Sequence, residues 1–241
     1  MKLKAVIAYD GSRFLGFQRQ SYTTNTIAGT IEQTLKKIQI DCKIVASGRT
    51  DKGVHATHQV IHFEAPHFWN DLQKLQHLLN MQLFEKGIYF KTLQQVNENF
   101  HARFSAKRRS YLYIMKPSPT VFEQSFVAKY GGYDLSKFID ALHCFKGTHD
   151  FEFFSKSGSE AKSSIRTIDF IWVKRYKNYT FCSIKANGFL RSQIRMMVGA
   201  SLEVAYAKTD ISQIKTQLQK QSTHFTTLAK GEGLYLSNVE Y

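Results

Sequence analysis

Hydrophobic and polar residues alternate along some segments of this chain and recur at intervals of three or four residues along others. Alternation is typical of a half-buried strand, and the longer interval is typical of a helix with one buried face. Thr26 precedes isoleucines and leucines at helical spacing, as a helix N-cap does, and Asp10 with Gly11 forms a turn after the first alternating segment. The pattern predicts, in order, a strand over 2–9, a helix over 27–37, strands over 43–46 and 59–63, a helix over 69–83 and a strand over 87–96.

A similar succession of elements begins again in the second half of the chain. No linker rich in proline or glycine divides the halves, and the segment 104–109 precedes the restart. Asp134 and Asp210 each precede apolar residues at helical spacing, so both are expected to cap helices. The pattern predicts a strand over 110–116, a helix after Asp134, strands over 167–175 and 179–186, helices from about 190 and after Asp210, and a strand over 233–240.

These elements predict an α/β (α+β) chain made of two similar units. In the first half, the order strand, helix, strand, strand, helix, strand is that of ferredoxin-like folds, in which helices pack on one face of a mixed or antiparallel sheet. We expect an N-terminal unit over 1–106 and a C-terminal unit over 107–241. The chain has 241 residues, of which 43% are hydrophobic, and this is enough for a packed core.

The charge balance indicates a polyanionic partner. Lysine and arginine number 33 against 19 aspartate and glutamate residues, which gives a formal net charge of +14. Nucleic acid is the expected partner of such a chain. A membrane is not expected, because no segment approaches the ~18 apolar residues of a spanning helix and no basic amphipathic anchor stands out. The N-terminus enters a strand pattern directly, unlike a signal peptide, so we expect a cytoplasmic protein.

The cysteines and histidines do not have the spacing of a metal site. Cys42, Cys144 and Cys182 are far apart and odd in number, so we expect neither a disulfide framework nor a zinc site, and all three are predicted to be small buried residues. His58 and His62 are four residues apart, but they lie in a segment with strand character, where that spacing does not form the metal-binding pair that it forms on a helix. We therefore expect no metal.

The segment 47–56 is the most informative part of the chain. It places Asp51 beside Arg49 in a loop that contains Gly48 and Gly53, between two predicted strands. Glycine accepts backbone conformations that other residues avoid and lets a large ligand come close, so Asp51 is a candidate nucleophile on a rigid support. The alternative is an ordinary turn, in which the carboxylate accepts a neighbouring backbone N–H and Arg49 is a solvated charge.

Two further segments combine basic and aromatic residues as nucleic-acid-binding proteins do. In 100–113, Tyr111 and Tyr113 would lie on one face of a strand, where a ring stacks on a base or packs in the core. The helix expected near 190 would carry Arg191 and Arg195 one turn apart, facing one ligand or solvent. The loop expected over 147–151 has a histidine and an aspartate but no nucleophile beside them. Basic candidates for contacts to nucleic acid are Arg103, Lys107, Arg108 and Arg191.

Taken together in their order, these motifs resemble those of the bacterial tRNA pseudouridine synthase A family, from end to end of the chain. The most specific is the Asp51 loop, and the others gain specificity from their spacing. They are 9–20 with its Tyr-Asp-Gly start, 48–56, 100–106, 147–151, 166–168, 187–199 with its Asn-Gly-Phe-Leu-Arg start, and 232–236. The resemblance implies a pseudouridine synthase fold and isomerisation of uridines at positions 38–40 of the tRNA anticodon stem-loop. It also implies a homodimer that binds tRNA and needs no cofactor or metal.

The resemblance also assigns roles to individual residues. Asp51 is similar to the catalytic aspartate of the family, and Arg49 to the arginine implicated in opening the target base pair. Tyr111 matches the tyrosine that stacks on the target uracil, Arg195 the basic residue that pairs with the aspartate, and Leu234 a hydrophobic residue near the base. The chain departs from the family in having Lys52 where a small residue is common, and Ser-Gln at 192–193 where histidine and methionine are common.

The chemistry of the reaction leaves two routes open at this stage. The carboxylate of Asp51 could attack C1′ of the ribose, as glycosidase nucleophiles do, or it could remove a ribose proton to give a glycal. In either case the uridine must leave its stack, and stacking on Tyr111 together with phosphate contacts would offset that cost. A different class of function is a non-catalytic tRNA-binding or chaperone module, in which Asp51 only closes a turn.

Overall fold

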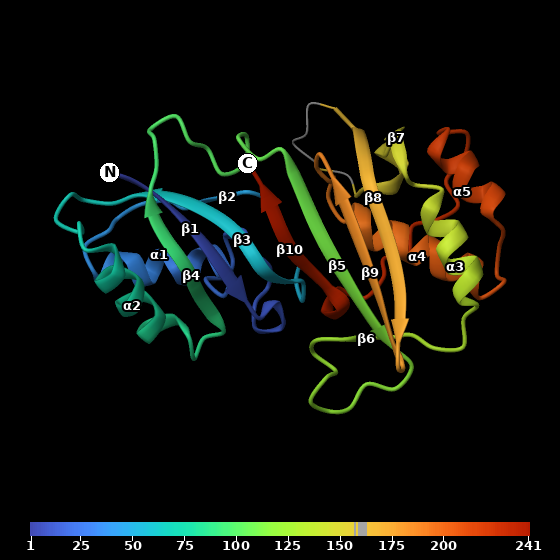
Figure 1. The fold of residues 1–241 in the computed structure, drawn as a ribbon, viewed down its shortest axis with the longest axis horizontal. Coiled ribbons are helices and arrows are strands. Elements are labelled where there is room, and N and C mark those ends of the chain that lie inside the picture. The colour runs from blue at the N-terminus through green and yellow to red at the C-terminus, as the bar shows by residue number, and fades with distance from the viewer. Residues whose placement is uncertain (157, 159–162) are drawn as a thin grey trace. The chain divides into compact units, whose positions relative to one another are not determined.

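The computed structural model describes residues 1–156, 158 and 163–241, and these form two compact units (Figure 1). Unit 1 comprises Met1–Lys107 together with Tyr235–Tyr241, and unit 2 comprises Arg108–Leu234. The last seven residues of the chain therefore belong with the first half of the sequence.

Unit 1 is built on a mixed sheet with the strand order β4-β1-β3-β10. Strands β4, β1 and β3 are antiparallel, β10 runs parallel to β3, and the short β2 pairs with β3. Helix α2 packs on β4 and also contacts α1. The elements are β1 (Lys2–Tyr9), α1 (Ile27–Lys37), β2 (Val45–Ala46), β3 (His55–Glu64), α2 (Leu72–Leu83), β4 (Ile88–Gln95) and β10 (Leu234–Glu240).

The predicted order of elements in unit 1 is confirmed, with shifted ends. The side chain of Thr26 accepts a hydrogen bond from the Gly29 N–H, so α1 begins where its N-cap predicts. Helix α2 begins three residues later than expected, because Asp71 is its N-cap and accepts a hydrogen bond from the Lys74 N–H. The strand expected over 43–46 is reduced to two residues, whereas β3 begins at His55, inside the segment expected to be a loop.

Unit 2 is built on strands in the order β5-β9-β8-β7, in which neighbouring strands are antiparallel. The two-residue β6 adds a parallel pairing to β5, and α3 packs against α4 beside β8. The elements are β5 (Arg108–Lys116), β6 (Ala128–Lys129), α3 (Leu135–His143), β7 (Gly147–Asp150), β8 (Ile165–Tyr176), β9 (Tyr179–Ala186), α4 (Gln193–Ala205) and α5 (Ile211–Leu218). The predicted caps Asp134 and Asp210 both accept a hydrogen bond from the first turn of their helix.

Three expectations for unit 2 and the cysteines are wrong. The segment 147–150 is not a loop but β7, which pairs with β8. Helix α4 begins at Gln193 and not near 190, because Ser192 has a positive φ of 59°, so Arg191 lies in the preceding turn. Only Cys182 is buried, whereas Cys42 and Cys144 are partly exposed, and all three are free thiols.

Each unit has its own core. In unit 1, residues from both helices and the central strands are shielded from solvent, and these include Leu3, Ile7, Ile27, Ile31, Leu35, Phe63, Leu79 and Phe90. In unit 2, the core is rich in aromatic rings, namely Tyr113, Phe138, Phe145, Phe151, Phe154 and Phe225. Among the described residues, no helix combines the length and the apolar character that a membrane crossing requires.

A buried histidine and the last residue of the chain both form hydrogen bonds with Ala102 in unit 1. His62 on β3 is 8% exposed, and its Nδ1 accepts a hydrogen bond from the Ala102 N–H at 3.1 Å. The hydroxyl of Tyr241 donates to the Ala102 carbonyl oxygen at 2.8 Å. Burial, together with the smaller effects of the nearby charges of His101 and Lys2, lowers the pKa of His62 to about 4.

We predict that His62 makes the chain sensitive to acid. Its pKa is lower in the folded state than in the unfolded state, so its contribution is present above pH 6.5 and is lost as the pH falls toward about 4. Between pH 7 and pH 5 this amounts to about 2 kcal/mol of unfolding free energy. The variant His62→Asn keeps an acceptor near the position of Nδ1 but does not titrate. Urea denaturation at pH 7 and pH 5 should show that the free energy of unfolding falls less for the variant than for the unsubstituted chain. An equal fall for both proteins would contradict the prediction.

Candidate active site

The turn that carries Asp51 is closed by the main chain. The Val54 N–H donates to the Asp51 carbonyl oxygen at 3.1 Å, and Gly53, at the third position of the turn, has a φ of +79°. Because this hydrogen bond uses the main-chain oxygen, the turn does not require the carboxylate. The side chain of Asp51 is half-buried, and that of Arg49 is exposed.

The residue before Asp51 is fixed from two sides. The buried hydroxyl of Tyr9, at the end of β1, hydrogen-bonds the hydroxyl of Thr50 at 2.8 Å. The carbonyl oxygen of Thr50 accepts a hydrogen bond from the Phe17 N–H at 3.0 Å. Gly16 permits this contact, because its φ is +114° and a Cβ there would lie 3.3 Å from the same carbonyl oxygen. The segment before α1 therefore packs directly on the backbone of the Asp51 loop.

Gln59 on β3 organises the start of the loop. It is fully buried, and its Oε1 accepts a hydrogen bond from the Ser47 hydroxyl at 2.6 Å. Its Nε2 donates to the Gly48 carbonyl oxygen at 2.8 Å, and the Ser47 N–H donates to the Val60 carbonyl oxygen at 2.8 Å. The loop is thus held to a strand by a buried amide, which is costly to remove because both partners would lose their hydrogen bonds.

The end of the loop is held by His55. Its Nδ1 accepts a hydrogen bond from the Gly11 N–H at 3.1 Å, so its 3.5 Å approach to the Asp10 carboxylate is not an ion pair in this tautomer. A Cβ at Gly11 would lie only 2.0 Å from the carbonyl oxygen of Val54, so this position requires glycine. The His55 ring stacks on Tyr235 of β10, with 4.7 Å between the centroids. The C-terminal strand therefore supports the loop from within unit 1.

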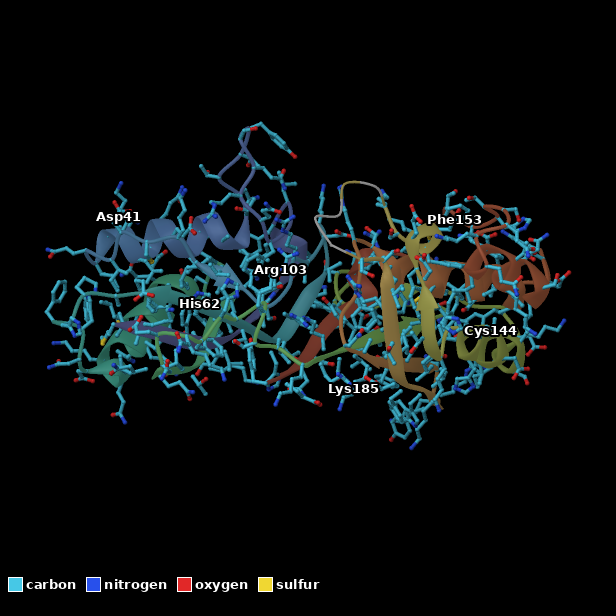
Figure 2. The ribbon with its side chains drawn as sticks, turned by 90° about the horizontal axis from the view of Figure 1, so that it is seen from above. Asp41, His62, Arg103, Cys144, Phe153 and Lys185 are labelled. Atoms are coloured by element: carbon cyan, nitrogen blue, oxygen red, sulfur yellow. The ribbon has the colours of Figure 1, made fainter. Side chains whose placement is uncertain are left out.

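Two other predicted residues of unit 1 lie on the surface. Arg103 is exposed, and its guanidinium carbon lies 5.6 Å from the centroid of the Phe104 ring, which is itself 77% exposed (Figure 2). Lys107 is exposed, and its N–H donates to the Glu240 carbonyl oxygen at 2.8 Å. The Arg103 and Phe104 pair offers a cation and an aromatic face side by side.

In unit 2, the two tyrosines of β5 differ in their surroundings. Both lie on the face of β5 that packs in the core, as their spacing predicts. Tyr113 is fully buried and its hydroxyl donates to the Lys230 carbonyl oxygen at 2.8 Å, so it is a core residue. Tyr111 is 8% exposed, and Phe189 meets it edge to face at 5.3 Å between centroids. That contact fixes the orientation of the Tyr111 ring.

Arg195 is held at the start of α4. Its Nε donates to the Ala229 carbonyl oxygen at 2.7 Å, and the Ala229 N–H donates back to the Arg195 carbonyl oxygen at 2.9 Å. Arg191 is exposed in the turn before α4, so the two arginines are not one turn apart on a helix. Leu234 begins β10 and is 5% exposed. Arg108 pairs with the Asp169 carboxylate at 2.6 Å.

The predicted site residues are thus divided between the units. Unit 1 carries Arg49, Asp51, Arg103 and Lys107, and unit 2 carries Arg108, Tyr111, Arg191, Arg195 and Leu234. Gln59 and Tyr9 were not predicted to support the loop, and the only signal for Gln59 is a polar residue inside a strand pattern. Among the described residues, no three His, Cys, Asp or Glu side chains are grouped as a metal site requires.

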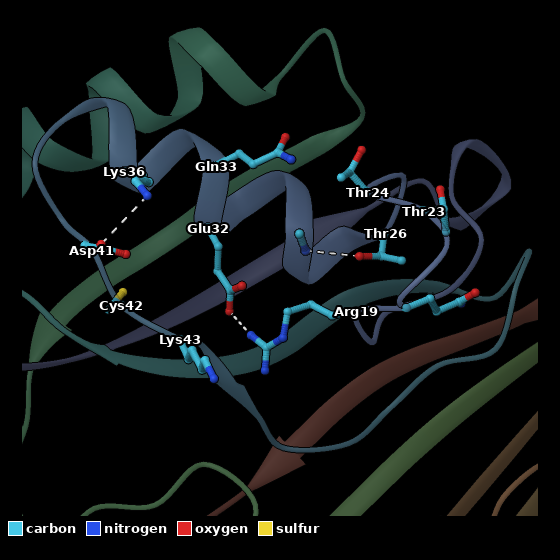
Figure 3. Close-up of a pocket in the computed structure, with 12 residues that line it drawn as sticks. Arg19, Thr23, Thr24, Thr26, Glu32, Gln33, Lys36, Asp41, Cys42 and Lys43 are labelled. Atoms are coloured by element: carbon cyan, nitrogen blue, oxygen red, sulfur yellow. Dashed lines mark hydrogen bonds and ion pairs between the residues drawn. The ribbon is translucent and has the colours of Figure 1, made fainter.

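A cavity of about 550 Å³ lies beside α1 (Figure 3). Its charged lining is largely paired. Arg19 forms an ion pair with Glu32, and Lys36 lies 3.9 Å from Asp41. None of the sequence-predicted site residues lines this cavity.

We predict that replacing Gly16 destabilises the chain by more than backbone strain alone, because Gly16 also contacts the Asp51 loop. Gly132 also has a positive φ, of +75°, but a Cβ there would meet nothing within 4 Å. Gly132→Ala should therefore cost about 1 kcal/mol of unfolding free energy from strain alone. Gly16→Ala should cost about 2 kcal/mol or more, because its φ is further from any conformation open to alanine and the Thr50 carbonyl must move. Chemical denaturation of both variants measures this, and equal costs would contradict the account.

Comparison with known proteins assigns the family. Residues 5–105 and 141–241 match the family described as tRNA pseudouridine synthase. The chain is 40% identical to "tRNA pseudouridine synthase A" of Helicobacter hepaticus over 244 residues, covering 99% of this chain and 98% of that protein. It is 37% identical to the protein of the same name from Wolinella succinogenes, covering 99% and 94% of the two chains. The corresponding Campylobacter jejuni protein is 36% identical and both chains are covered completely.

A solved structure gives a weaker likeness. A chain in the crystal structure of a Cbf5-Nop10-Gar1 complex is 12% identical, with a TM-score of 0.39, covering 83% of this chain and 45% of that one. The assignment therefore depends on the sequence relatives, which extend over the full length of the chain. The chain belongs to the tRNA pseudouridine synthase family.

Proposed function

We propose that the chain converts uridine to pseudouridine at positions 38–40 of the tRNA anticodon stem-loop, with the Asp51 carboxylate as the reacting group. The observation that carries this proposal is the support around Asp51. Its neighbour Thr50 is fixed by Tyr9 and Phe17, and the start of its loop is fixed by Gln59. A carboxylate on a loop fixed in this way can be presented to a ribose with little loss of entropy at the moment of reaction.

The isomerisation requires only one acid–base or nucleophilic group. The bond between N1 and C1′ breaks, the uracil turns, and a bond between C5 and C1′ forms, while the C5 proton goes to water and N1 gains a proton. Electrons balance without an oxidant or reductant, so no cofactor or metal is assigned a role. Asp51 attacks C1′, or it removes a ribose proton to give a glycal, and both routes begin from the ionised carboxylate. The non-catalytic RNA-binding module is not favoured, because the full-length relatives are named as synthases.

The roles proposed in unit 2 concern the target base. Tyr111 stacks on the uracil, since Phe189 already holds its ring in one orientation. Arg195 stabilises the anion of Asp51. Its side chain and its main chain both form hydrogen bonds with Ala229, and these hold Nε of the guanidinium in one position. Leu234 supplies an apolar contact near the base. In unit 1, Arg49 is proposed to take part in opening the target base pair.

The positive charge supports binding of the RNA backbone. Arg103, Lys107 and Arg191 are exposed and are proposed to contact phosphates, with Phe104 beside Arg103 as a stacking surface for an unpaired base. Arg108 is expected to contribute less than the others, because the Asp169 carboxylate already pairs with it. A chain that acts on tRNA in this way is proposed to work in the cytoplasm.

A homodimer is also part of the proposal, and the sheet of unit 2 supports it. The face of this sheet opposite Tyr113 exposes large apolar side chains, with Phe170 49% and Trp172 42% exposed. The strand register places Leu112 on the same row as Trp172, through Ser183 of β9. Neighbouring apolar side chains that are exposed on one face of a sheet are typical of a protein interface. Its members are Leu112, Ile114, Phe170, Trp172, Tyr176 and Phe181.

We predict that the anticodon arm is the substrate. Three stem-loop RNAs of identical length, each with a single uridine at position 38, 39 or 40, should yield pseudouridine when incubated with the chain. A matched stem-loop from the T arm, with one uridine in a similar context, should not. Chromatographic analysis of the released nucleosides distinguishes pseudouridine from uridine. Product from the T-arm RNA alone would contradict the proposed substrate while leaving the proposed chemistry intact.

A further inference from the structure

The turn that follows β9 is held by two other strands of unit 2, β5 and β8. The Asn187 N–H donates to the Thr167 carbonyl oxygen at 3.1 Å, and the Thr167 N–H donates to the Asn187 side-chain oxygen at 3.0 Å. Arg109 on β5 donates from Nη1 to the Asn187 carbonyl oxygen at 3.3 Å. The turn between Asn187 and Gly188 therefore has a fixed position relative to β5 and β8.

Arg166 lies beside this turn in a fixed orientation. Its Nη1 donates to two carbonyl oxygens, that of Ser163 at 2.8 Å and that of Ile165 at 2.6 Å. A Cβ at Gly188 would lie 3.5 Å from Nε of Arg166, so the guanidinium packs closely against the glycine. The side chain is half-buried. Its hydrogen-bonding geometry is therefore established before any ligand binds.

Arg109 and Arg166 bring two positive charges close together. Burial lowers the pKa of Arg166, and the charge of Arg109 lowers it further. Two guanidinium groups at one place favour an oxyanion that accepts hydrogen bonds from both.

The strand register relates this pair to Tyr111. Arg109 and Tyr111 are two residues apart on β5, so both lie on the same face of the strand, about 7 Å apart along it. Ala186 of β9 pairs with Arg109 on one side and with Ile168 of β8 on the other. Arg166 is two residues before Ile168, which brings it to the same end of the sheet.

We propose that Arg109 and Arg166 bind the RNA backbone phosphate next to the target uridine. This inference rests on the proposed function, because it takes Tyr111 as the residue that stacks on the target base. A base and the phosphate of its own or the adjoining nucleotide are separated by a distance comparable to that between Tyr111 and Arg109. The phosphate contact therefore positions the flipped nucleotide, whereas base stacking holds its uracil.

A purely structural role for Arg166 would have different consequences. In that case its hydrogen bonds to Ser163 and Ile165 would only hold the start of β8, and its removal would lower stability without selecting any phosphate. The test must therefore measure the contribution of each RNA phosphate to binding separately. Binding is measured in the Asp51→Asn background, so that the RNA is not converted during the measurement.

The experiment compares anticodon stem-loop RNAs that carry one neutral methylphosphonate linkage at each phosphate near the target uridine. In the parent protein, one linkage is expected to weaken binding about tenfold. In Arg166→Gln, the same linkage should cause less than a twofold loss, because the partner of that phosphate is already absent. The salt dependence of log Kd should also become shallower by about 0.7–0.9. Lys137→Gln, on the exposed face of α3, removes the same charge and should retain the full effect of the linkage.

Other outcomes also decide the matter. If every linkage weakens the parent and Arg166→Gln equally, the proposed phosphate site is wrong. If Arg166→Gln does not fold, Arg166→Lys replaces it, and a loss of linkage sensitivity again supports the site. If no linkage near the target uridine matters in the parent, the proposal is overturned without any variant. Pseudouridine formation by the unsubstituted chain on the same RNA tests the proposed function separately, so failure of the reaction and failure of the phosphate site are distinguishable.

Discussion

The buried hydrogen bond between the hydroxyls of Tyr9 and Thr50 is the constraint on which the candidate active site depends. It joins the end of β1 to the residue before Asp51 at a distance of 2.8 Å. Gln59 forms hydrogen bonds with the start of the same loop. Gly16 allows the segment before α1 to pack on the backbone of the loop. Removing one partner of such a buried pair leaves the other unsatisfied, at a cost of about 1–3 kcal/mol. Stability of the core and presentation of Asp51 are therefore coupled.

Buried amides have a similar task in unit 2. Gln217 on α5 donates to the carbonyl oxygens of Phe153 and Phe225, and its Oε1 accepts from the N–H groups of His224 and Phe225. These bonds hold the segment that leads to the main-chain contact of Arg195. Gln193 accepts from the Leu190 N–H and thereby shapes the turn before α4. In both units, a glutamine in a regular element fixes a loop that carries a proposed site residue.

The sequence predicted the parts of the fold that depend on local signals. Thr26, Asp134 and Asp210 have local partners in the first turn of each helix, so their caps could be read from the chain. Strand β7 was missed because its four residues, Gly147–Asp150, resemble a turn and become a strand only through pairing with β8. The start of α4 was misplaced because Ser192 has a positive φ, which the spacing of the apolar residues from 190 onward does not indicate.

The site was predictable to a similar extent. Glycine, arginine and aspartate in one short segment made the Asp51 loop recognisable. Its supports Tyr9 and Gln59 follow the ordinary alternation of strands, and their hydrogen bonds join residues 41 and 12 positions apart.

The most direct test of the account measures tritium released to water from tRNA labelled at uridine C5. Release by the unsubstituted chain and none by Asp51→Asn, with tRNA binding unchanged, is the predicted result. Binding of tRNA by both proteins with no release by either would contradict it and would favour a non-catalytic RNA-binding module.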